Sequence, residues 1–199
     1  MKRLLIMVLA LLAVPMLAFA EAEVGKPAPD FSAVDTNGQP FKLADAKGSI
    51  VVLEWSNHEC PFVHKYHVKG DMQGLQAKYT AKGVQWVRVL SSAPGKQGHV
   101  SDAQANAIIA KEGIKATHTL RDESGSIGHL YGAKSTPHMF VIDKEGVVAY
   151  AGAIDSIRSP RQEDIAAATP YVVNALDALL EGKPVEVSNT QPYGCGIKY

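Results

Sequence analysis

The order of strand-like and helical segments predicts an α/β fold with a mixed central sheet. Apolar, β-branched runs near residues 50–56, 84–91 and 138–143 alternate with segments whose apolar spacing is typical of helices. A further run at 147–152 follows closely and predicts a closing antiparallel pair. The sequence therefore predicts a sandwich in which helices flank a mixed sheet, and it contains no internal repeat or low-complexity linker.

Residues 1–20 have the pattern of a secretory signal peptide. A basic start, Met1-Lys2-Arg3, precedes an apolar run from Leu4 to Leu17 and the small-x-small site Ala18-Phe19-Ala20. A retained anchor is the alternative, but the run is shorter than the ~20 apolar residues that a membrane span needs. We expect a mature chain that starts at Glu21, is secreted across the inner membrane into the periplasm, and is not membrane-bound.

The composition after residue 20 indicates one globular domain with a sizeable core. Lys plus Arg total 20 and Asp plus Glu total 20, without a basic stripe, which argues against a nucleic-acid partner. The expected partner is a small molecule or another protein. We assign residues 21–187 to the domain and residues 188–199 to a C-terminal tail.

Turn and cap signals define the individual elements. Asn37-Gly38 lies between two short strand-like runs in residues 31–43, which predicts an N-terminal β-hairpin. Helices are expected from residue 61 to about 82, with a break at 70–71, then at about 102–112 and at about 169–182. Their expected N-caps are Asp71 and Thr169, and their expected stops are Gly83, Gly113 and Gly182.

Cys60 is the most informative residue of the chain. It follows an apolar run and a short polar turn, and it stands directly before Pro61, which suits the first position of a helix. The free N–H groups and the positive dipole end of a helix favour the thiolate over the thiol. Nucleophilic sulfur chemistry is the leading hypothesis. The alternative is a structural disulfide with Cys195, the one other cysteine in an exported chain.

Three motifs frame Cys60. Cys60-Pro61 ends a strand-to-helix turn, Thr136-Pro137 interrupts the start of a strand some seventy residues later, and Glu54 lies six residues before the cysteine. With the order of elements, these motifs resemble the thioredoxin-like superfamily, in particular its redoxin or alkyl hydroperoxide reductase/thiol-specific antioxidant (AhpC/TSA) branch, over about residues 24–182. The resemblance implies a thioredoxin-like three-layer sandwich and an antioxidant-type thiol oxidoreductase without a cofactor.

The resemblance also implies roles for the framing residues. Cys60 would be the nucleophile, and Glu54 would accept its proton if the side chain faces inward; an outward, solvated Glu54 is the alternative. Thr136 and a cis Pro137 would bind the substrate, although most X-Pro bonds are trans. The expected substrate is a protein thiol or disulfide or a small peroxide, and the expected reductant is an external thiol.

The chain departs from the family patterns around Cys60. Val63 stands where thioredoxins carry the second cysteine of Cys-x-x-Cys, so a resolving thiol must come from elsewhere. Asn57 stands where peroxiredoxins carry Thr or Ser; it could still donate a hydrogen bond to the substrate, but the peroxide-aligning pattern is absent. Arg88 and Arg121 are candidates for polarising a peroxide, with ordinary surface charge as the alternative.

Cys195 is the candidate resolving cysteine. It lies between Gly194 and Gly196 in a tail that could swing to and from the active site. In a two-cysteine cycle it would resolve a mixed disulfide on Cys60. As a permanent bridge, the same pair would stabilise the fold by ~4–5 kcal/mol in the chain-entropy model.

A metal site is a further alternative from another class of function. Imidazole and thiolate ligands suit copper or zinc, and the exported Sco-type copper chaperones share the thioredoxin-like fold. This chain lacks their Cys-x-x-x-Cys pair. The alternative reading is therefore a non-catalytic copper carrier with a structural disulfide, and its candidate ligands are His58, Cys60, His64, His67 and His138.

Overall fold

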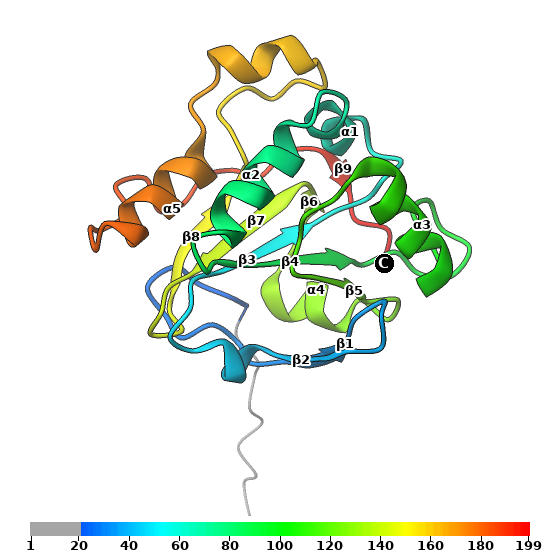
Figure 1. The fold of residues 1–199 in the computed structure, drawn as a ribbon, viewed down its shortest axis with the longest axis horizontal. Coiled ribbons are helices and arrows are strands. Elements are labelled where there is room, and N and C mark those ends of the chain that lie inside the picture. The colour runs from blue at the N-terminus through cyan, green and yellow to red at the C-terminus, as the bar shows by residue number, and fades with distance from the viewer. Residues whose placement is uncertain (1–20) are drawn as a thin grey trace, which may run out of the picture.

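A computed structural model describes residues 21–199, so the expected signal peptide at 1–20 lies outside the described residues (Figure 1). A five-stranded sheet with the order β5-β4-β3-β7-β8 forms its centre. The strands are β3 (Val51–Trp55), β4 (Gln85–Leu90), β5 (His118–Arg121), β7 (His138–Ile142) and β8 (Val148–Gly152). Strands β3, β4 and β5 are parallel, whereas β7 runs antiparallel to both β3 and β8. The predicted mixed sheet is confirmed.

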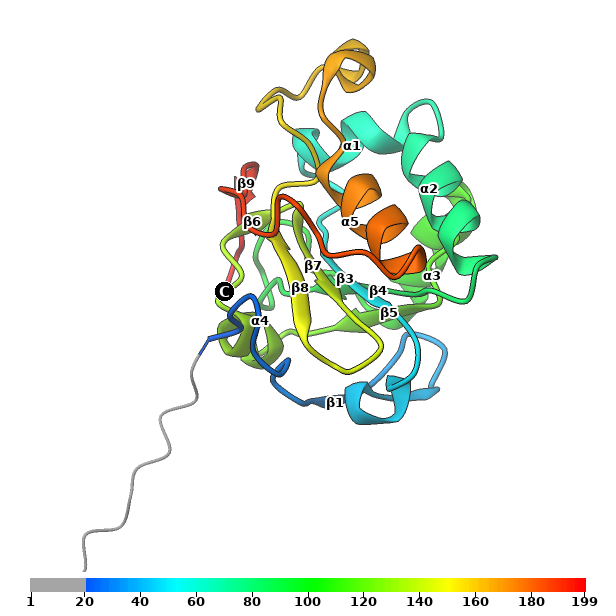
Figure 2. The same cartoon turned by 90° about the vertical axis from the view of Figure 1, so that its left-hand side faces the viewer.

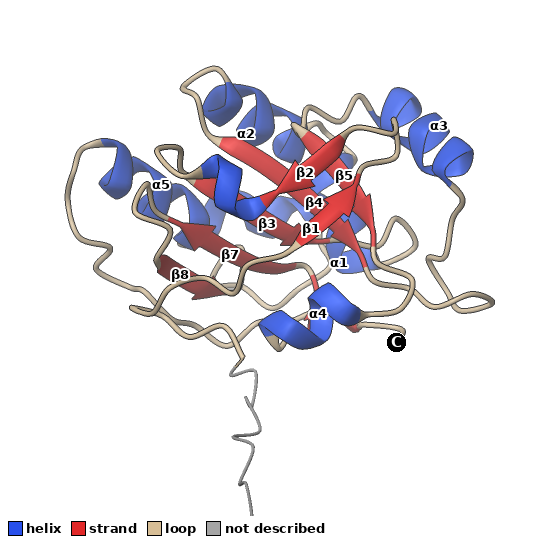
Figure 3. Cartoon of the chain, turned by 90° about the horizontal axis from the view of Figure 1, so that it is seen from below, coloured by secondary structure: helices blue, strands red, loops and turns tan. Residues whose placement is uncertain are grey.

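Two further layers cover the faces of the sheet. One face carries α1 (Pro61–His67), α2 (Asp71–Thr80) and α5 (Tyr171–Leu180) (Figures 1 and 2). Figure 3 shows the opposite face, with β1 (Ser32–Val34), β2 (Pro40–Lys42) and α4 (Ser126–Tyr131) in front of the sheet. The remaining helices are α3 (Asp102–Glu112) and two 3-10 turns, Leu43–Ala46 and Gln162–Ala167. The three-layer sandwich is thus confirmed.

The alternation of side chains along β3 divides the core in two. Val51, Leu53 and Trp55 pack with the hairpin and α4, whereas Val52 packs with the helices on the other face. Every residue of β3 is buried, because both faces of this central strand are covered. The same alternation places Glu54 on the helix-covered face, beneath α2.

Glycine turns end several elements as the sequence predicts. Asn37-Gly38 connects β1 and β2 in an antiparallel hairpin, with Gly38 at φ 78°. The break between α1 and α2 falls at Gly70, whose φ is 84°. Helix α3 begins with a capping box between Ser101 and Gln104 and ends at Gly113 with φ 64°.

Two predicted N-caps are wrong. Gly70 is the N-cap of α2, and Asp71 is its first helical residue, where its carboxylate accepts a hydrogen bond from Gln162 at 3.0 Å. Pro170 is the N-cap of α5, because Thr169 is held outside the helix by two hydrogen bonds with Ser156. The N-cap of each helix therefore lies one residue away from the residue expected to cap it.

The short elements that depend on tertiary contacts were not predicted. They include β5 and α4, and also β6 (Ser135–Thr136) and β9 (Cys195–Gly196), which pair antiparallel with each other. Strand β9 belongs to the C-terminal tail, which leaves α5, forms a bridge between Asn189 and Ala151 of β8, and then reaches β6 (Figure 2). The tail therefore runs from α5 past β8 to the cis-proline strand β6.

No helix within residues 21–199 is both long enough and apolar enough to span a bilayer.

Candidate functional site

Cys60 lies at the N-terminus of α1, just after the carboxyl end of β3. It is the N-cap residue, Pro61 occupies the first helical turn, and the Cys60 carbonyl accepts a hydrogen bond from His64 N at 2.8 Å. The turn before it is closed by Cys60 N, which donates to Asn57 O at 3.0 Å. The Cys60 side chain is fully buried. The predicted position of the sulfur at a helix start is therefore confirmed, and the positive end of the α1 dipole faces it.

A disulfide joins Cys60 to Cys195 across 135 residues of sequence, with the two Cα atoms 6.0 Å apart. The two cysteine residues are unequally exposed, because Cys60 is fully buried whereas Cys195 is half-buried. Cys60 Sγ also lies 3.1 Å from the carbonyl oxygen of Thr136.

The Thr136-Pro137 peptide bond is cis, as the resemblance to the thioredoxin-like superfamily implied. Thr136 pairs with Cys195 in the β6–β9 ladder, and its neighbour Ser135 pairs with Gly196. The backbone that was predicted to bind a substrate thus holds the protein's own tail. Cys60, Cys195, Thr136 and Pro137 come together as one site.

Tyr193 anchors the tail in a buried polar cluster that sequence reasoning missed. Its hydroxyl donates to Asp155, and Lys65 Nζ lies 3.2 Å from that hydroxyl and 3.1 Å from the Asp155 carboxylate. The Lys65 and Asp155 side chains are 0% and 4% exposed. Tyr66 also donates to Asp155. Burial and the hydrogen bond to Asp155 raise the pKa of Tyr193, so the phenol stays protonated.

Further contacts hold the tail on both sides of Tyr193. Thr190 N donates to Ala151 O at 3.1 Å, and Ala93 N donates to Lys198 O at 2.8 Å. The Tyr199 ring stacks on His129 with the centroids 4.0 Å apart. The glycine-flanked segment, expected to swing, is therefore docked along its length in this structure.

Gly194 is required by the close approach of the tail to the cis-proline loop. Its φ is 140°, a conformation that favours glycine, and a Cβ there would overlap the carbonyl oxygen of Thr136. A Cβ on Gly196 would meet no atom within 4 Å. The two glycines beside Cys195 therefore have different structural roles.

Glu54 faces inward, as the proton-acceptor hypothesis required, but its carboxylate is already engaged. Trp86 Nε1 donates to it at 2.7 Å and Gln76 Nε2 at 3.2 Å, and Arg88 Nε lies 3.6 Å from its other oxygen. Glu54 and Arg88 are 0% and 2% exposed. The two side chains thus form a buried ion pair without a hydrogen bond between them, since neither Glu54 Oε1 nor Arg88 Nε has a hydrogen-bond partner among residues 21–199.

Asn57 and the two candidate arginines have structural partners. The side-chain carbonyl oxygen of Asn57 accepts a hydrogen bond from Glu59 N at 2.9 Å, which shapes the turn before Cys60. Arg88 donates to Ser56 Oγ at 3.1 Å and faces Glu54, and Arg121 pairs with Asp102 and Glu123. Each arginine therefore has a carboxylate as its neighbour.

The histidines near Cys60 are dispersed. His64 is exposed and His58 half-buried, whereas His67 is buried with Nδ1 3.5 Å from Glu112. Burial lowers the pKa of His138 to about 3, and its neutral Nδ1 accepts from Lys134 N at 3.2 Å. Within the part of the chain that the structure describes, no three His, Cys, Asp or Glu side chains are grouped to hold a metal ion. The five proposed ligands do not form a site.

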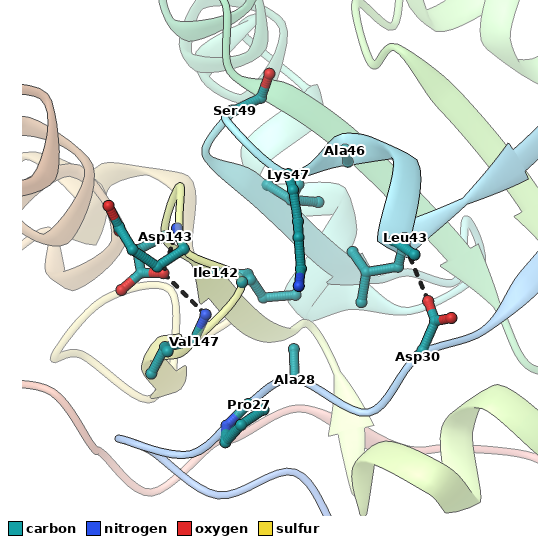
Figure 4. A pocket seen from close by; sticks show the side chains of 14 residues that line it. Pro27, Ala28, Asp30, Leu43, Ala46, Lys47, Ser49, Ile142, Asp143 and Val147 are labelled. Atoms are coloured by element: carbon teal, nitrogen blue, oxygen red, sulfur yellow. Dashed lines mark hydrogen bonds between the residues drawn. The ribbon is translucent and has the colours of Figure 1, made fainter.

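A cavity of about 320 Å³ lies at the other end of the sheet from Cys60. It borders Val51 at the start of β3, whereas Cys60 follows the end of this strand. Figure 4 shows Lys47 extending into it between Leu43 and Ile142. The cavity is therefore remote from the disulfide.

Comparisons with known proteins agree with this geometry. A thiol-disulfide oxidoreductase ResA from Bacillus thuringiensis is 31% identical over 131 residues, which span 63% of this chain and 67% of the relative. The crystal structure of an uncharacterized conserved protein from Geobacillus kaustophilus superposes with a TM-score of 0.78 at 28% identity, covering 89% of this chain and 92% of the other.

A second crystal structure, from Chlorobium tepidum, is provisionally described as a thiol:disulfide interchange protein DsbE. It has a TM-score of 0.54 at 28% identity and covers 78% of this chain and 99% of its own. A family model described as Redoxin matches residues 23–169, well over half of the sequence. The chain belongs to the redoxin family.

Proposed function

We propose that this protein is a thiol-disulfide oxidoreductase whose redox-active pair is Cys60 and Cys195. Membership of the redoxin family and the similarity to ResA support a thiol-based redox function. The observation that carries the proposal is the disulfide between a cysteine at a helix N-terminus and a half-exposed cysteine on a separate tail. Such a pair replaces the local Cys-x-x-Cys dithiol that Val63 removes.

In the first half of the cycle the reduced protein acts on a disulfide of a protein substrate. The Cys60 thiolate attacks one substrate sulfur, forms a mixed disulfide and releases the other substrate sulfur as a thiolate, which takes up a proton. The Cys195 thiolate then attacks Cys60 Sγ, which forms the Cys60–Cys195 bond and releases the second substrate thiol. The substrate gains two electrons and two protons, and the protein loses them.

In the second half an external dithiol reduces the protein. Its thiolate attacks the sulfur of Cys195, the more exposed of the two cysteine residues, and Cys60 leaves as a thiolate at the start of α1. The helix N-terminus stabilises this leaving group. The second thiol of the reductant then releases Cys195, and the reductant becomes a disulfide.

Glu54 is proposed as the proton acceptor for Cys60, acting within its buried network with Arg88. Thr136 and Pro137 are proposed to bind the substrate backbone, and Asn57 to shape the turn that presents Cys60. The contacts of both arginines favour disulfide exchange over the peroxide reduction expected of an antioxidant enzyme, because each already faces a carboxylate.

We also propose that residues 1–20 direct export, that residues 21–187 form the redox domain, and that the protein acts in the periplasm. A disulfide is consistent with an oxidising compartment outside the cytoplasm. Sequencing of the exported protein is expected to begin at Glu21, and a retained Met1 would contradict this.

The function is tested by measuring the reduction potential and the reduction of insulin by a dithiol. We expect a potential above about −300 mV, the range of exchangeable rather than structural bridges. We also expect loss of activity in Cys60→Ser and trapped mixed disulfides on Cys60 in Cys195→Ser. A potential well below that value, together with an inactive wild type, would identify the disulfide as structural.

A further inference from the structure

The tail is bound in the manner expected of an extended peptide. Residues 193–196 contribute a two-residue strand, Cys195–Gly196, that pairs with β6, a disulfide to Cys60 and the buried aromatic ring of Tyr193. Addition of a strand to an exposed edge is a common mode of peptide recognition, in which side-chain pockets supply the specificity. The tail therefore reveals which side chains the surface accepts at each position.

The position two residues before the cysteine has a built pocket, which we call the phenol slot and define by Phe62, Lys65 and Asp155. The Tyr193 ring meets the Phe62 ring edge-on with the centroids 5.9 Å apart, and its hydroxyl meets Lys65 and Asp155. Tyr193 is 4% exposed. The slot thus encloses the ring and offers both a carboxylate and an ammonium to one hydroxyl.

We propose that β6 and the phenol slot form a substrate subsite for an extended segment Tyr-Gly-Cys of a partner protein, which takes the place of the tail. This inference rests on the proposed thiol-disulfide exchange and adds the sequence that the exchange prefers. The partner cysteine takes the position of Cys195, with its sulfur bonded to Cys60 in the mixed disulfide.

Each preference follows from a contact. Phenylalanine in the slot would leave Lys65 and Asp155 without the hydroxyl, and an unpaired buried polar group is destabilising. Alanine would also leave the volume beside Phe62 unfilled. Any side chain directly before the cysteine would overlap the Thr136 carbonyl, as a Cβ on Gly194 would.

The occupied subsite also explains how the cycle returns to the oxidised state. The partner segment and the tail compete for the same edge of β6, so docking of Tyr193 brings Cys195 back to Cys60 as the partner segment leaves. Resolution of the mixed disulfide and release of the substrate are then one exchange of strands.

The test uses the mature chain carrying Cys195→Ser, with Cys60 reduced, and peptides with the sequence of residues 191–198. Each peptide cysteine is activated as a mixed disulfide with 2-nitro-5-thiobenzoate. Attack by the Cys60 thiolate on the peptide sulfur forms the protein–peptide disulfide and releases the coloured thiolate. The measured quantity is the second-order rate constant.

We expect the peptide carrying Tyr193→Ala to react about tenfold more slowly than the parent peptide, or slower still. The peptide with Tyr193→Phe should react at an intermediate rate. The peptide with Gly194→Ala should be as slow as the Tyr193→Ala peptide. Equal rates for all four peptides, with a reactive Cys60, would overturn the subsite and leave the proposed function intact. No reaction with any peptide or with a small disulfide would overturn both.

Variants of the protein provide a second measurement. In the Cys195→Ser chain, Gly194→Ala is expected to displace the tail and raise the rate of the parent peptide several-fold. The matched Gly196→Ala has room for its Cβ and is expected to retain the docked tail. A similar rate in both variants would show that the tail does not occupy the subsite and would overturn the proposal.

Discussion

At the scale of single residues, the Glu54–Arg88 pair illustrates how strongly burial constrains a charge. Both side chains are inside the domain; Trp86 and Gln76 donate to one oxygen of Glu54, and Arg88 donates to Ser56. A buried ion pair contributes little net stability compared with apolar residues, but the loss of one partner leaves an uncompensated charge. Glu54 is therefore sensitive to substitution whether or not it transfers protons.

Replacing the Glu54 carboxylate tests how much it contributes to the stability of the fold. Glu54→Gln is expected to lower the free energy of unfolding by about 3–5 kcal/mol, because Arg88 remains charged and buried. Urea denaturation measures the change. The double variant Glu54→Gln/Arg88→Met removes both charges and should recover part of the loss. If the double variant is less stable than the single variant, the uncompensated charge of Arg88 is not the reason for the loss of stability in Glu54→Gln.

His138 makes stability depend on pH. Its pKa of about 3 in the folded protein is below the ordinary value of 6.5, because it is buried. Between these values the unfolded chain binds a proton that the folded chain does not, so stability is complete above pH 6.5 and falls as the pH falls.

From pH 8 to pH 5, His138 should lower the free energy of unfolding by about 2 kcal/mol. Urea denaturation at both values measures this, and His138→Leu should reduce the difference. An unchanged difference in the variant would assign the acid sensitivity to other groups, of which His67 is the first candidate since burial also lowers its pKa.

The residues that sequence could identify were those with local signals. Cys60 stands before a proline, Glu54 lies within an apolar strand, and Pro137 interrupts one. Lys65 and Asp155 have no such signal, because they are 90 positions apart and meet only after folding. Lys65 lies on the buried face of α1, and a lysine there needs a buried partner, but its partner Asp155 cannot be identified from the sequence.

At the scale of elements, the capping box of α3 is a clear local determinant. Ser101 Oγ accepts from Gln104 N, and the Gln104 side chain accepts from Ser101 N. Ser101→Ala should reduce stability by about 1 kcal/mol, whereas Ser101→Gly should reduce it by only a few tenths. Thermal unfolding of the two variants checks this, and equal losses would exclude a capping effect.

Long elements were predictable and short ones were not. Strands β3, β4 and β7 are apolar runs that lie between the two outer layers, and α3 and α5 carry clear apolar periodicity or stop signals. Strands β6 and β9 have two residues each and exist because the tail docks there. No pattern within two residues can specify such a pairing.

At the scale of the whole molecule, the disulfide connects the turn before α1 to the C-terminal tail. In the chain-entropy model, a loop of 135 residues stabilises the folded state by ~4–5 kcal/mol. Urea unfolding with and without dithiothreitol should differ by about this amount. The Cys60→Ser/Cys195→Ser variant should show no difference, and a large one would assign the effect to the reductant itself.

The anchors of the tail also set the effective concentration of Cys195 at Cys60. The stacking of Tyr199 on His129 and the burial of Tyr193 hold one thiol beside the other without touching either sulfur. A tenfold change in this effective concentration shifts the potential of the pair by about 30 mV. Changes to the aromatic side chains of the tail are therefore expected to shift the potential of the pair even when the residues around Cys60 stay the same.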